Sequence, residues 1–267
     1  MPPFPRSVTL GRSGLAVGPL GVAGGYGVGA AALRGAFDRG VNYFYHGSRR
    51  SAGMRTAIRD LVAAGERDHL VLVLQSYTRF PALLERSLAA GLRQLSLDHA
   101  DVFLLGWFNG MPGERLLERA ERMRSSGMFA RLAISGHRRP SFVTFAADPR
   151  FDVLHLRYNA AHPGAEQDVF PHLAASGRPG TVVYTATRWG SLLNPRKMPP
   201  GETPPQGRDA YRFVLSNPDV DVCMCGPRND AELDEALAAL DEGPLTPVEE
   251  ERIRAVGRWV HDHSLLR

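Results

Sequence analysis

The sequence predicts a (β/α)8 barrel, and three observations lead to that prediction. Short runs of β-branched and apolar residues alternate with longer runs of helical composition along the chain, and such alternation predicts a parallel sheet. The alternation yields eight strand-helix units, which close best as a barrel. The length of 267 residues suits one such barrel, which takes about 250 residues. We therefore expect a single domain over residues 1–267.

The eight expected strands are short and apolar. Leu70–Leu74 and Val102–Leu105 are continuously apolar, as strands buried on both faces of a parallel sheet should be. The other runs share this composition, and each precedes a helical run. In chain order the expected strands are Leu20–Ala23, Val41–Tyr45, Leu70–Leu74, Val102–Leu105, Ala130–Ser135, Val153–Leu156, Thr181–Thr185 and Val220–Cys225.

The expected helices are marked by the residues at their ends. Pro81 and Pro247 suit the first turn of a helix. Thr246, followed three residues later by Glu249, has the spacing of a capping box. The expected helices are Ala30–Asp38, Met54–Ala64, Pro81–Leu95, Gly113–Ser125, Pro140–Ala147, Ala165–Ala175, Ala210–Leu215, Ala231–Leu240 and an extra final helix, Pro247–His263.

An open, doubly wound sheet is the alternative architecture. It would require a glycine-rich phosphate turn after its first strand. Residues 24–29 read Gly-Gly-Tyr-Gly-Val-Gly, which is rich in glycine but does not fit the G-x-G-x-x-G pattern. The barrel is therefore the preferred architecture.

Composition argues against several functional classes. The formal charge is +4, and the basic residues of the chain are scattered without a Lys/Arg block. Nucleic-acid binding usually needs a basic face. The first six residues lack the apolar run of a signal peptide. No stretch approaches the roughly 20 apolar residues of a membrane helix. We expect a cytoplasmic protein that binds a small molecule, and neither nucleic acid nor membrane.

Metal and disulfide chemistry are not expected. Cys223 and Cys225 are the only cysteines, so a disulfide framework is not the design. They could supply at most two metal ligands, and no two histidines have the H-x-x-x-H spacing of a helical metal pair. Small buried residues are the simpler interpretation of both cysteines.

Seven segments resemble segments of the aldo-keto reductases, in the same order along the chain. The first, Leu10–Val17, resembles the opening hairpin of that family. The others resemble three of its strands, two turns after strands and its last cofactor-binding segment: Arg39–Phe44, Arg67–Leu74, Leu132–His137, Tyr158–Asn159, Tyr184–Gly190 and Gly226–Leu233. The resemblance implies a barrel with an N-terminal β-hairpin and an extra C-terminal helix, and NADP(H)-dependent reduction of a carbonyl compound.

The resemblance also implies a catalytic tetrad of Asp, Tyr, Lys and His, and all four positions hold other residues. Tyr45 stands for the aspartate, Arg50 for the tyrosine, Gln75 for the lysine and Gly106 for the histidine. A carbonyl reductase needs a general acid with a tuned pKa at the carbonyl oxygen, and the usual Tyr-Lys pair is missing. Tyr45 or the adjacent His46 is the candidate acid. The candidate catalytic residues are Tyr45, His46, Arg50 and Gln75.

Polar and aromatic residues follow the strands at the expected mouth of the barrel, where barrel enzymes keep their chemistry. Arginines there favour anions such as carboxylates, and three follow the second and third strands: Arg49, Arg50 and Arg79. They favour a small anionic carbonyl compound as substrate. The candidate substrate-binding residues are Arg49, Ser76, Trp107 and His137.

The nicotinamide cofactor site that the resemblance implies is partly retained. Ser135 and Tyr184 match residues that contact the nicotinamide, and Arg228 matches one that reaches the 2′-phosphate of NADP. Gly136 replaces an asparagine, and Glu232 puts a carboxylate where it would repel that phosphate. The expected cofactor is NADP(H), with NAD(H) left open. The candidate cofactor-binding residues are Ser135, His155, Tyr184, Thr185, Arg188, Gly226 and Arg228.

Three functions remain open from the sequence. An NADP(H)-dependent oxidoreductase with an altered proton path is favoured by the retained cofactor residues Ser135, Tyr184 and Arg228. A non-redox lyase, isomerase or cyclase on the same barrel is favoured by the loss of the tetrad beside a polar mouth. A binding or regulatory protein without catalysis is favoured by that loss together with Glu232 and Ala236. The oxidoreductase is preferred because the cofactor residues survive.

Overall fold

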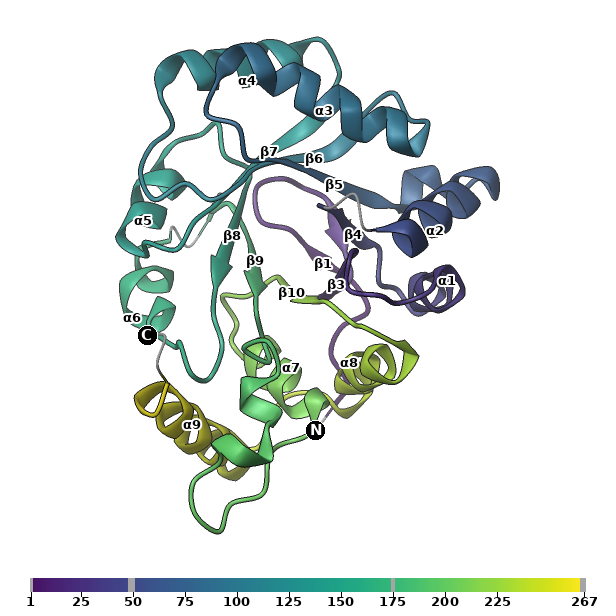
Figure 1. Ribbon diagram of the computed structural model, residues 1–267. Coiled ribbons are helices and arrows are strands. Elements are labelled where there is room, and N and C mark those ends of the chain that lie inside the picture. Colours follow the sequence, from purple (N-terminus) through teal and green to yellow (C-terminus); the bar gives the residue numbers. More distant parts are fainter. Residues whose placement is uncertain (1, 48–50, 174–175, 265–267) are drawn as a thin grey trace.

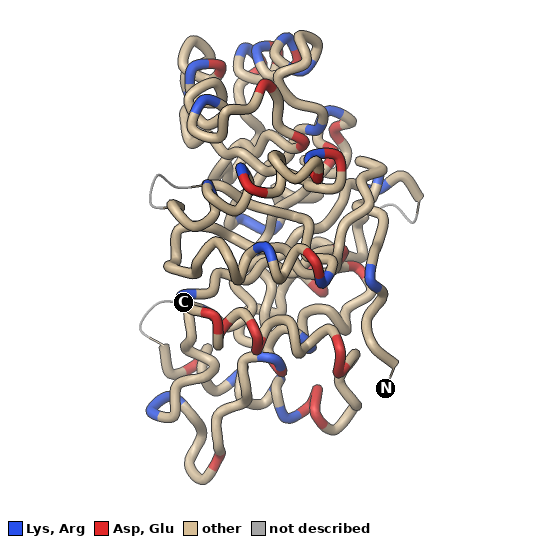
Figure 2. Tube along the Cα trace, turned by 90° about the vertical axis from the view of Figure 1, so that its right-hand side faces the viewer, with Lys and Arg blue, Asp and Glu red and all other residues tan. Residues whose placement is uncertain are grey.

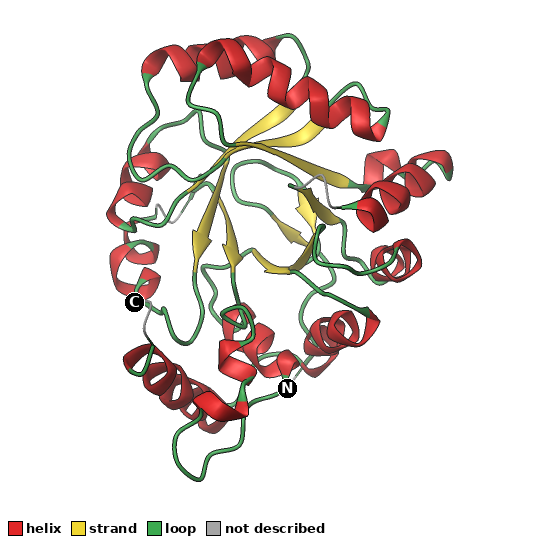
Figure 3. Ribbon diagram, in the orientation of Figure 1, coloured by secondary structure: helices red, strands yellow, loops and turns green. Residues whose placement is uncertain are grey.

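Eight parallel strands close into a barrel that is wrapped by helices (Figures 1 and 3). The computed structural model describes residues 2–47, 51–173 and 176–264. The strand order is β10-β3-β4-β5-β6-β7-β8-β9, with β9 paired to β10, which confirms the (β/α)8 prediction. The strands are β3 (Leu20–Ala23), β4 (Tyr43–His46), β5 (Val71–Ser76), β6 (Ala100–Leu105), β7 (Phe129–Ser135), β8 (Val153–Arg157), β9 (Gly180–Tyr184) and β10 (Val222–Cys225).

A short antiparallel hairpin precedes the barrel and closes its N-terminal end. It pairs β1 (Val8–Thr9) with β2 (Ala16–Val17), as the resemblance implied. Leu10 and Val17 are fully buried in the same apolar cluster as the residues inside the barrel. The residues of this hairpin therefore fill the end of the barrel opposite the carboxyl ends of the strands.

Successive strand side chains point alternately into the barrel and toward the helices. Tyr43, Val71 and Val73 belong to the interior cluster, whereas Phe44 and Leu72 pack in the outer cluster under the helices. This alternation decides which residues at the strand ends reach the mouth. Residues two or four positions from an interior residue on the same strand face the mouth, and their immediate neighbours face the helices.

Nine α-helices lie within the described residues, and side-chain caps start the last three of them. The capping box of Thr246 and Glu249 starts the last helix, as expected. The helix expected over residues 165–175 instead ends at Asp168 and is followed by a 3-10 turn, Phe170–His172, because Pro171 has no N–H to donate. The helices are α1 (Ala30–Asp38), α2 (Ala52–Ala63), α3 (Pro81–Leu95), α4 (Glu114–Ser125), α5 (Pro140–Ala147), α6 (Ala165–Asp168), α7 (Gly207–Leu215), α8 (Asp230–Glu242) and α9 (Pro247–Asp262).

The charged residues are distributed rather than gathered. Figure 2 shows Lys and Arg interspersed with Asp and Glu along the trace. Many arginines are paired, for example Arg178 with Asp221 at 2.7 Å and Arg254 with Glu166 at 2.8 Å. Among the described helices, none is both long and apolar enough to cross a membrane. In the same part of the chain, no group of three or more His, Cys, Asp or Glu residues is placed to hold a metal ion.

Candidate active site

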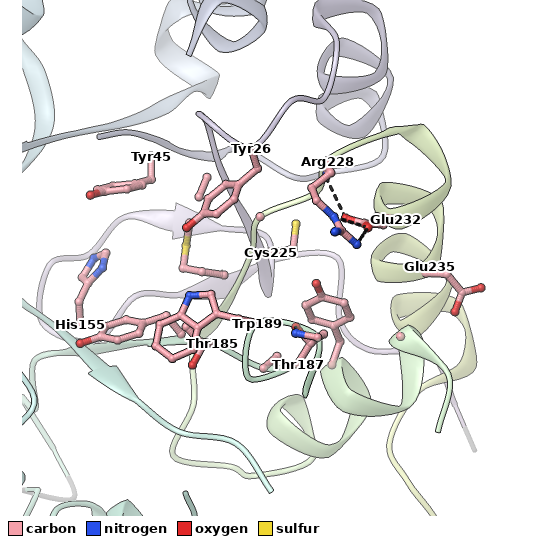
Figure 4. Close-up of a pocket in the computed structure, with 18 of the residues that line it drawn as sticks. Tyr26, Tyr45, His155, Thr185, Thr187, Trp189, Cys225, Arg228, Glu232 and Glu235 are labelled. Carbon is pink, nitrogen blue, oxygen red and sulfur yellow. Dashed lines mark hydrogen bonds and ion pairs between the residues drawn. The ribbon is translucent and has the colours of Figure 1, made fainter. Parts of the chain in front are cut away.

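A cavity of about 800 Å³ opens at the carboxyl ends of the strands. Its inner end, formed by Tyr45, His155 and Tyr184, lies over the barrel. Its outer end, formed by Arg228, Glu232 and Glu235, lies at the start of α8, and Figure 4 shows the side chains spread between the two ends. The volume is in the range of about 300 to 1,000 Å³ typical of small-molecule and cofactor sites.

The cavity brings together most of the residues proposed from the sequence. Ten of them line it: Tyr45, Gln75, Trp107, Ser135, His137, His155, Tyr184, Thr185, Gly226 and Arg228. Three described candidates, His46, Ser76 and Arg188, are not among the lining residues. Arg49 and Arg50 lie outside the described residues.

His46 and Ser76 face the helices because each directly follows an inward-facing residue. His46 comes after Tyr45 on β4 and is 5% exposed. Burial lowers the pKa of His46, and the nearby Gln94 of α3 opposes that shift. The Ser76 hydroxyl accepts a hydrogen bond from the backbone N–H of Thr78 at 3.3 Å. Of the two candidate acids on β4, only Tyr45 therefore lines the cavity.

Arg188 holds the turn after β9 against the last helix. Its guanidinium donates to the carbonyl of Val260 at 2.9 Å and to the hydroxyl of Ser264 at 2.8 Å. Arg188, Trp189 and Gly190 all have positive φ. The anchored turn places Trp189, which is 70% exposed, at the edge of the cavity, so Arg188 acts on the site through that turn.

Tyr45 occupies the aspartate position implied by the resemblance, and its ring faces the cavity (Figure 4). The ring lies over Gly47, where an added Cβ would come within 2.2 Å of it. Burial raises the pKa of Tyr45, and the electrostatic interaction with the neighbouring Tyr77 raises it further. The groups that contribute most to that shift are the neighbouring tyrosines Tyr77, Tyr26 and Tyr184. Tyr45 is therefore a neutral phenol with a proton to donate.

Gln75 lies across the position where the resemblance implies a histidine. An added Cβ at Gly106 would meet Gln75 Nε2 at 2.0 Å and Tyr77 Cδ1 at 2.8 Å. The Gln75 Oε1 atom is fully enclosed and has no hydrogen-bond partner within the described residues. The Gln75 side chain thus fills the space that a side chain at position 106 would need.

Gly106→Ala is expected to destabilise the protein because its Cβ would overlap the Gln75 side chain. Overpacking of this kind costs about 1 to 3 kcal/mol in the free energy of unfolding. In a Gln75→Ala background the same change should cost less than half as much, since the main obstacle is gone. Denaturant unfolding of the four proteins measures this coupling, and an equal cost in both backgrounds would contradict it.

His155 and Tyr184 form the inner end, where His155 Nε2 and the Tyr184 hydroxyl each have a hydrogen-bond partner. His155 Nε2 lies 2.8 Å from the Tyr43 hydroxyl, and burial lowers the pKa of His155 to about 3, so the ring is neutral. The Tyr184 hydroxyl donates to the carbonyl of Gly136 at 2.8 Å. The inner end therefore offers uncharged, largely aromatic surfaces to a ligand.

Exposed aromatic residues surround the entrance, and one of them, Trp107, is among the candidate substrate-binding residues. Trp107, which was expected, is 60% exposed and has positive φ. Its backbone N–H donates to the Ser135 hydroxyl at 3.0 Å, and its ring meets His137 edge-on. The aromatic residues at the entrance that were not among the candidate site residues are Tyr26, Tyr77 and Trp189.

Arg79 does not line the cavity, and backbone carbonyls engage its guanidinium. Its guanidinium donates to the carbonyls of Tyr77, Gly106 and Trp107 at 2.9, 3.1 and 2.5 Å. It also lies 3.7 Å from the ring centroid of Phe108. The arginine expected to attract carboxylates instead supports the loops that carry the aromatic entrance.

At the outer end Arg228 is paired with a carboxylate four residues later. Glu232 Oε1 accepts from Arg228 Nε at 2.7 Å and from Nη2 at 2.5 Å, and its Oε2 accepts from the Arg228 backbone N–H at 2.9 Å. Asn229 caps the helix by accepting from the backbone N–H of Glu232 at 2.9 Å. Figure 4 shows the contact between Arg228 and Glu232 as dashed lines. The charge of Arg228 is thus already balanced.

The chain is similar in structure to the aldo-keto reductase AKR11C1 from Bacillus halodurans. Its apo form gives a TM-score of 0.76 at 18% identity, covering 94% of this chain and 95% of that chain. The holo form gives a TM-score of 0.76 at 19% identity with the same coverage. No protein-family model matches the chain, and no curated protein matches its sequence. The likeness shows the aldo-keto reductase fold, which confirms the resemblance inferred from the ordered segments.

Proposed function

We propose that this protein is an NAD(P)H-dependent oxidoreductase that reduces a small carbonyl compound. The observation that carries the proposal is one continuous cavity that joins a neutral aromatic inner end to a polar outer end. A nicotinamide dinucleotide has the same division, with an uncharged aromatic ring at one end and an adenosine at the other. The fold class supports the proposal only by analogy.

The residues present fit a nicotinamide dinucleotide in part. Tyr184, Ser135 and His155 would hold the nicotinamide at the inner end, and Trp189 and Arg228 would hold the remainder. The hydroxyl of Ser135 already accepts from Trp107, which leaves its own proton to donate. When bound, the cofactor supplies the hydride that reduces the carbonyl carbon.

Tyr45 would supply the proton in this reaction. It is the one candidate acid on β4 that lines the cavity, and its raised pKa keeps the phenol protonated at neutral pH. A general acid works best with a pKa near the working pH, and the described residues give Tyr45 no cation to lower it. We therefore expect proton donation that is slower than in an enzyme with a tuned acid.

The aromatic entrance favours an apolar or aromatic carbonyl substrate. Tyr26, Tyr77, Trp107 and Trp189 expose large rings there, and exposed apolar clusters beside a cavity mark ligand-binding surfaces. Since Arg79 is held by carbonyls, it gives no support to the anionic substrate expected from the sequence.

A dinucleotide titration is the first test of the proposed function. Two of the three tryptophans, Trp107 and Trp189, line the cavity, so cofactor binding should quench fluorescence with a Kd in the micromolar range. Trp259 stacks on His263, does not line the cavity, and should contribute a constant background. Absence of binding by either dinucleotide at millimolar concentration would overturn the proposal.

A dinucleotide-binding protein without catalysis is the second candidate. It is favoured by one observation: none of the groups that most affect the pKa of Tyr45 is a cation. A screen of aromatic and aliphatic aldehydes with bound NADH separates the two candidates. Binding without oxidation of NADH by any carbonyl would support the non-catalytic alternative.

A further inference from the structure

A buried tyrosine beneath the cavity controls the orientation of a cavity-lining histidine. Tyr43 of β4 has no exposed surface and lies inside the barrel. Its hydroxyl is 2.8 Å from Nε2 of His155 on β8, 112 residues away in the sequence. This is the hydroxyl's only hydrogen bond within the described part of the chain.

The contact determines which ring nitrogen of His155 carries the proton. A buried hydroxyl left without an acceptor is unfavourable, and among the described residues Nε2 is the one acceptor that contacts the Tyr43 hydroxyl. If Tyr43 donates to Nε2, that nitrogen must be unprotonated, so a neutral ring carries its proton on Nδ1. Because burial keeps the ring neutral, the Nδ1–H tautomer is the one that satisfies both groups.

The Nδ1 atom faces the cavity. Among the described residues, four side-chain polar atoms are fully enclosed without a partner: His46 Nδ1, Arg67 Nε, Gln75 Oε1 and His261 Nδ1. His155 Nδ1 is not one of them, although no described residue hydrogen bonds to it. His155 lines the cavity and is 4% exposed. We therefore assign part of this exposed surface to Nδ1.

We propose that Tyr43 and His155 together present a fixed, uncharged N–H donor at the floor of the cavity. Such a donor suits a neutral carbonyl or amide oxygen, because a charged acceptor would have to be buried beside a neutral ring. The identity of the acceptor rests on the proposed function, which makes it the carboxamide oxygen of nicotinamide. His155 contacts the ligand, and Tyr43 is a positioning residue that acts through it.

Three variants test whether His155 acts as a hydrogen-bond donor or only packs against the ligand. His155→Asn places an amide nitrogen near the position of Nδ1, whereas His155→Gln places one near the position of Nε2. Tyr43→Phe removes the hydroxyl and keeps the ring. The isosteric pair at position 155 leaves Tyr43 intact, so the comparison remains valid if Tyr43→Phe fails to fold.

The tautomer is measured directly in the free protein by ¹⁵N NMR of the histidine rings. The His155 signals are identified as those lost in both position-155 variants. We expect a protonated Nδ1 and an unprotonated Nε2 at pH 7, and a shift toward the Nε2–H form in Tyr43→Phe. A native protein with its proton on Nε2 would overturn the inference.

The ligand contact is measured by titration with NADH. One neutral hydrogen bond contributes a factor of about five in affinity, so Tyr43→Phe and His155→Gln should each bind NADH about fivefold more weakly. His155→Asn should stay within about twofold of the native protein because its amide replaces the Nδ1–H donor. Equal affinity in all four proteins would remove His155 from the ligand contact. If the native protein binds no dinucleotide, the proposed function fails, and the NMR measurement still decides the tautomer.

Discussion

Tyr45→Phe is expected to lower kcat/KM for carbonyl reduction about 100-fold while leaving dinucleotide affinity unchanged. A positioned general acid contributes about 10² to 10⁴-fold to rate, and an acid whose pKa is not matched to neutral pH belongs at the lower end of that range. The variant keeps the ring that packs over Gly47, so the loop conformation should persist. Stopped-flow or steady-state oxidation of NADH with a reactive aldehyde provides the measurement.

Tyr77→Phe is the matched control for that experiment. Tyr77 also lines the cavity and influences the pKa of Tyr45, yet it is 58% exposed and lies at the entrance. Removal of its hydroxyl should change the rate by less than about tenfold, since it affects proton donation only through its neighbour. A Tyr45→Phe enzyme with native turnover would exclude Tyr45 as the acid.

The pH dependence of reduction follows from the direction of the Tyr45 pKa shift. Tyr45 donates its proton from the neutral form, and burial together with the neighbouring tyrosines raises its pKa above the ordinary value. The acid therefore remains protonated as the pH rises from about 6 to about 9. In that range we expect no decrease in kcat/KM of the native protein that can be assigned to Tyr45, that is, no decrease that is absent from Tyr45→Phe. Such a decrease would mean that a cation lowers the pKa of Tyr45.

The fold was predictable because strand and helix signals agree along the whole chain. Continuous apolar runs such as Leu70–Leu74 lie within two residues of the observed strand ends, and the prolines at positions 81 and 247 start helices as expected. The boundaries moved where a local cap or a missing donor decided them. Asp209 accepts from the backbone N–H of Gln206 at 2.9 Å, and α7 starts at Gly207, earlier than composition indicated.

Side-chain direction at the strand ends follows from the period of two along a strand. Tyr45 and Gln75 face the cavity, so this period turns their neighbours His46 and Ser76 toward the helices. Both neighbours were expected in the site because their residue types suit acid–base chemistry and hydrogen bonding. The alternation of side chains outweighs residue type here, and it excludes both residues from the cavity.

The partners of the charged and buried polar groups could not be predicted from the sequence. The guanidinium of Arg188 is held by Val260, 72 residues later, and the guanidinium of Arg79 is held in part by Trp107, 28 residues later. Barrel closure brings Tyr43 to His155. Contacts of this kind depend on tertiary geometry, whereas a residue's identity alone indicates only that it is able to make them.

Glu232→Gln is expected to raise the affinity for NADPH about tenfold while leaving NADH affinity within about threefold. In the native protein three hydrogen bonds join Glu232 to Arg228, so the charge of Arg228 is already neutralised. The 2′-phosphate of NADPH would also lie near the carboxylates of Asp230 and Glu232 in the first turn of α8. A carboxylate suits a ribose 2′-hydroxyl, whereas a free arginine suits a 2′-phosphate. The native protein should accordingly bind NADH more tightly than NADPH.

The control for this prediction is a charge change on the same helix outside the cavity. Asp234→Asn alters the net charge by the same amount, and Asp234 does not line the cavity, so it should change the NADPH affinity by less than about twofold. Because Arg228 is largely exposed, the gain in Glu232→Gln should shrink as salt screens the contact between guanidinium and phosphate. Titrations of both variants with both dinucleotides at low and high ionic strength give the full comparison. A native preference for NADPH that Glu232→Gln leaves unchanged would mean that the phosphate binds away from Arg228, and that the outer end does not select the cofactor.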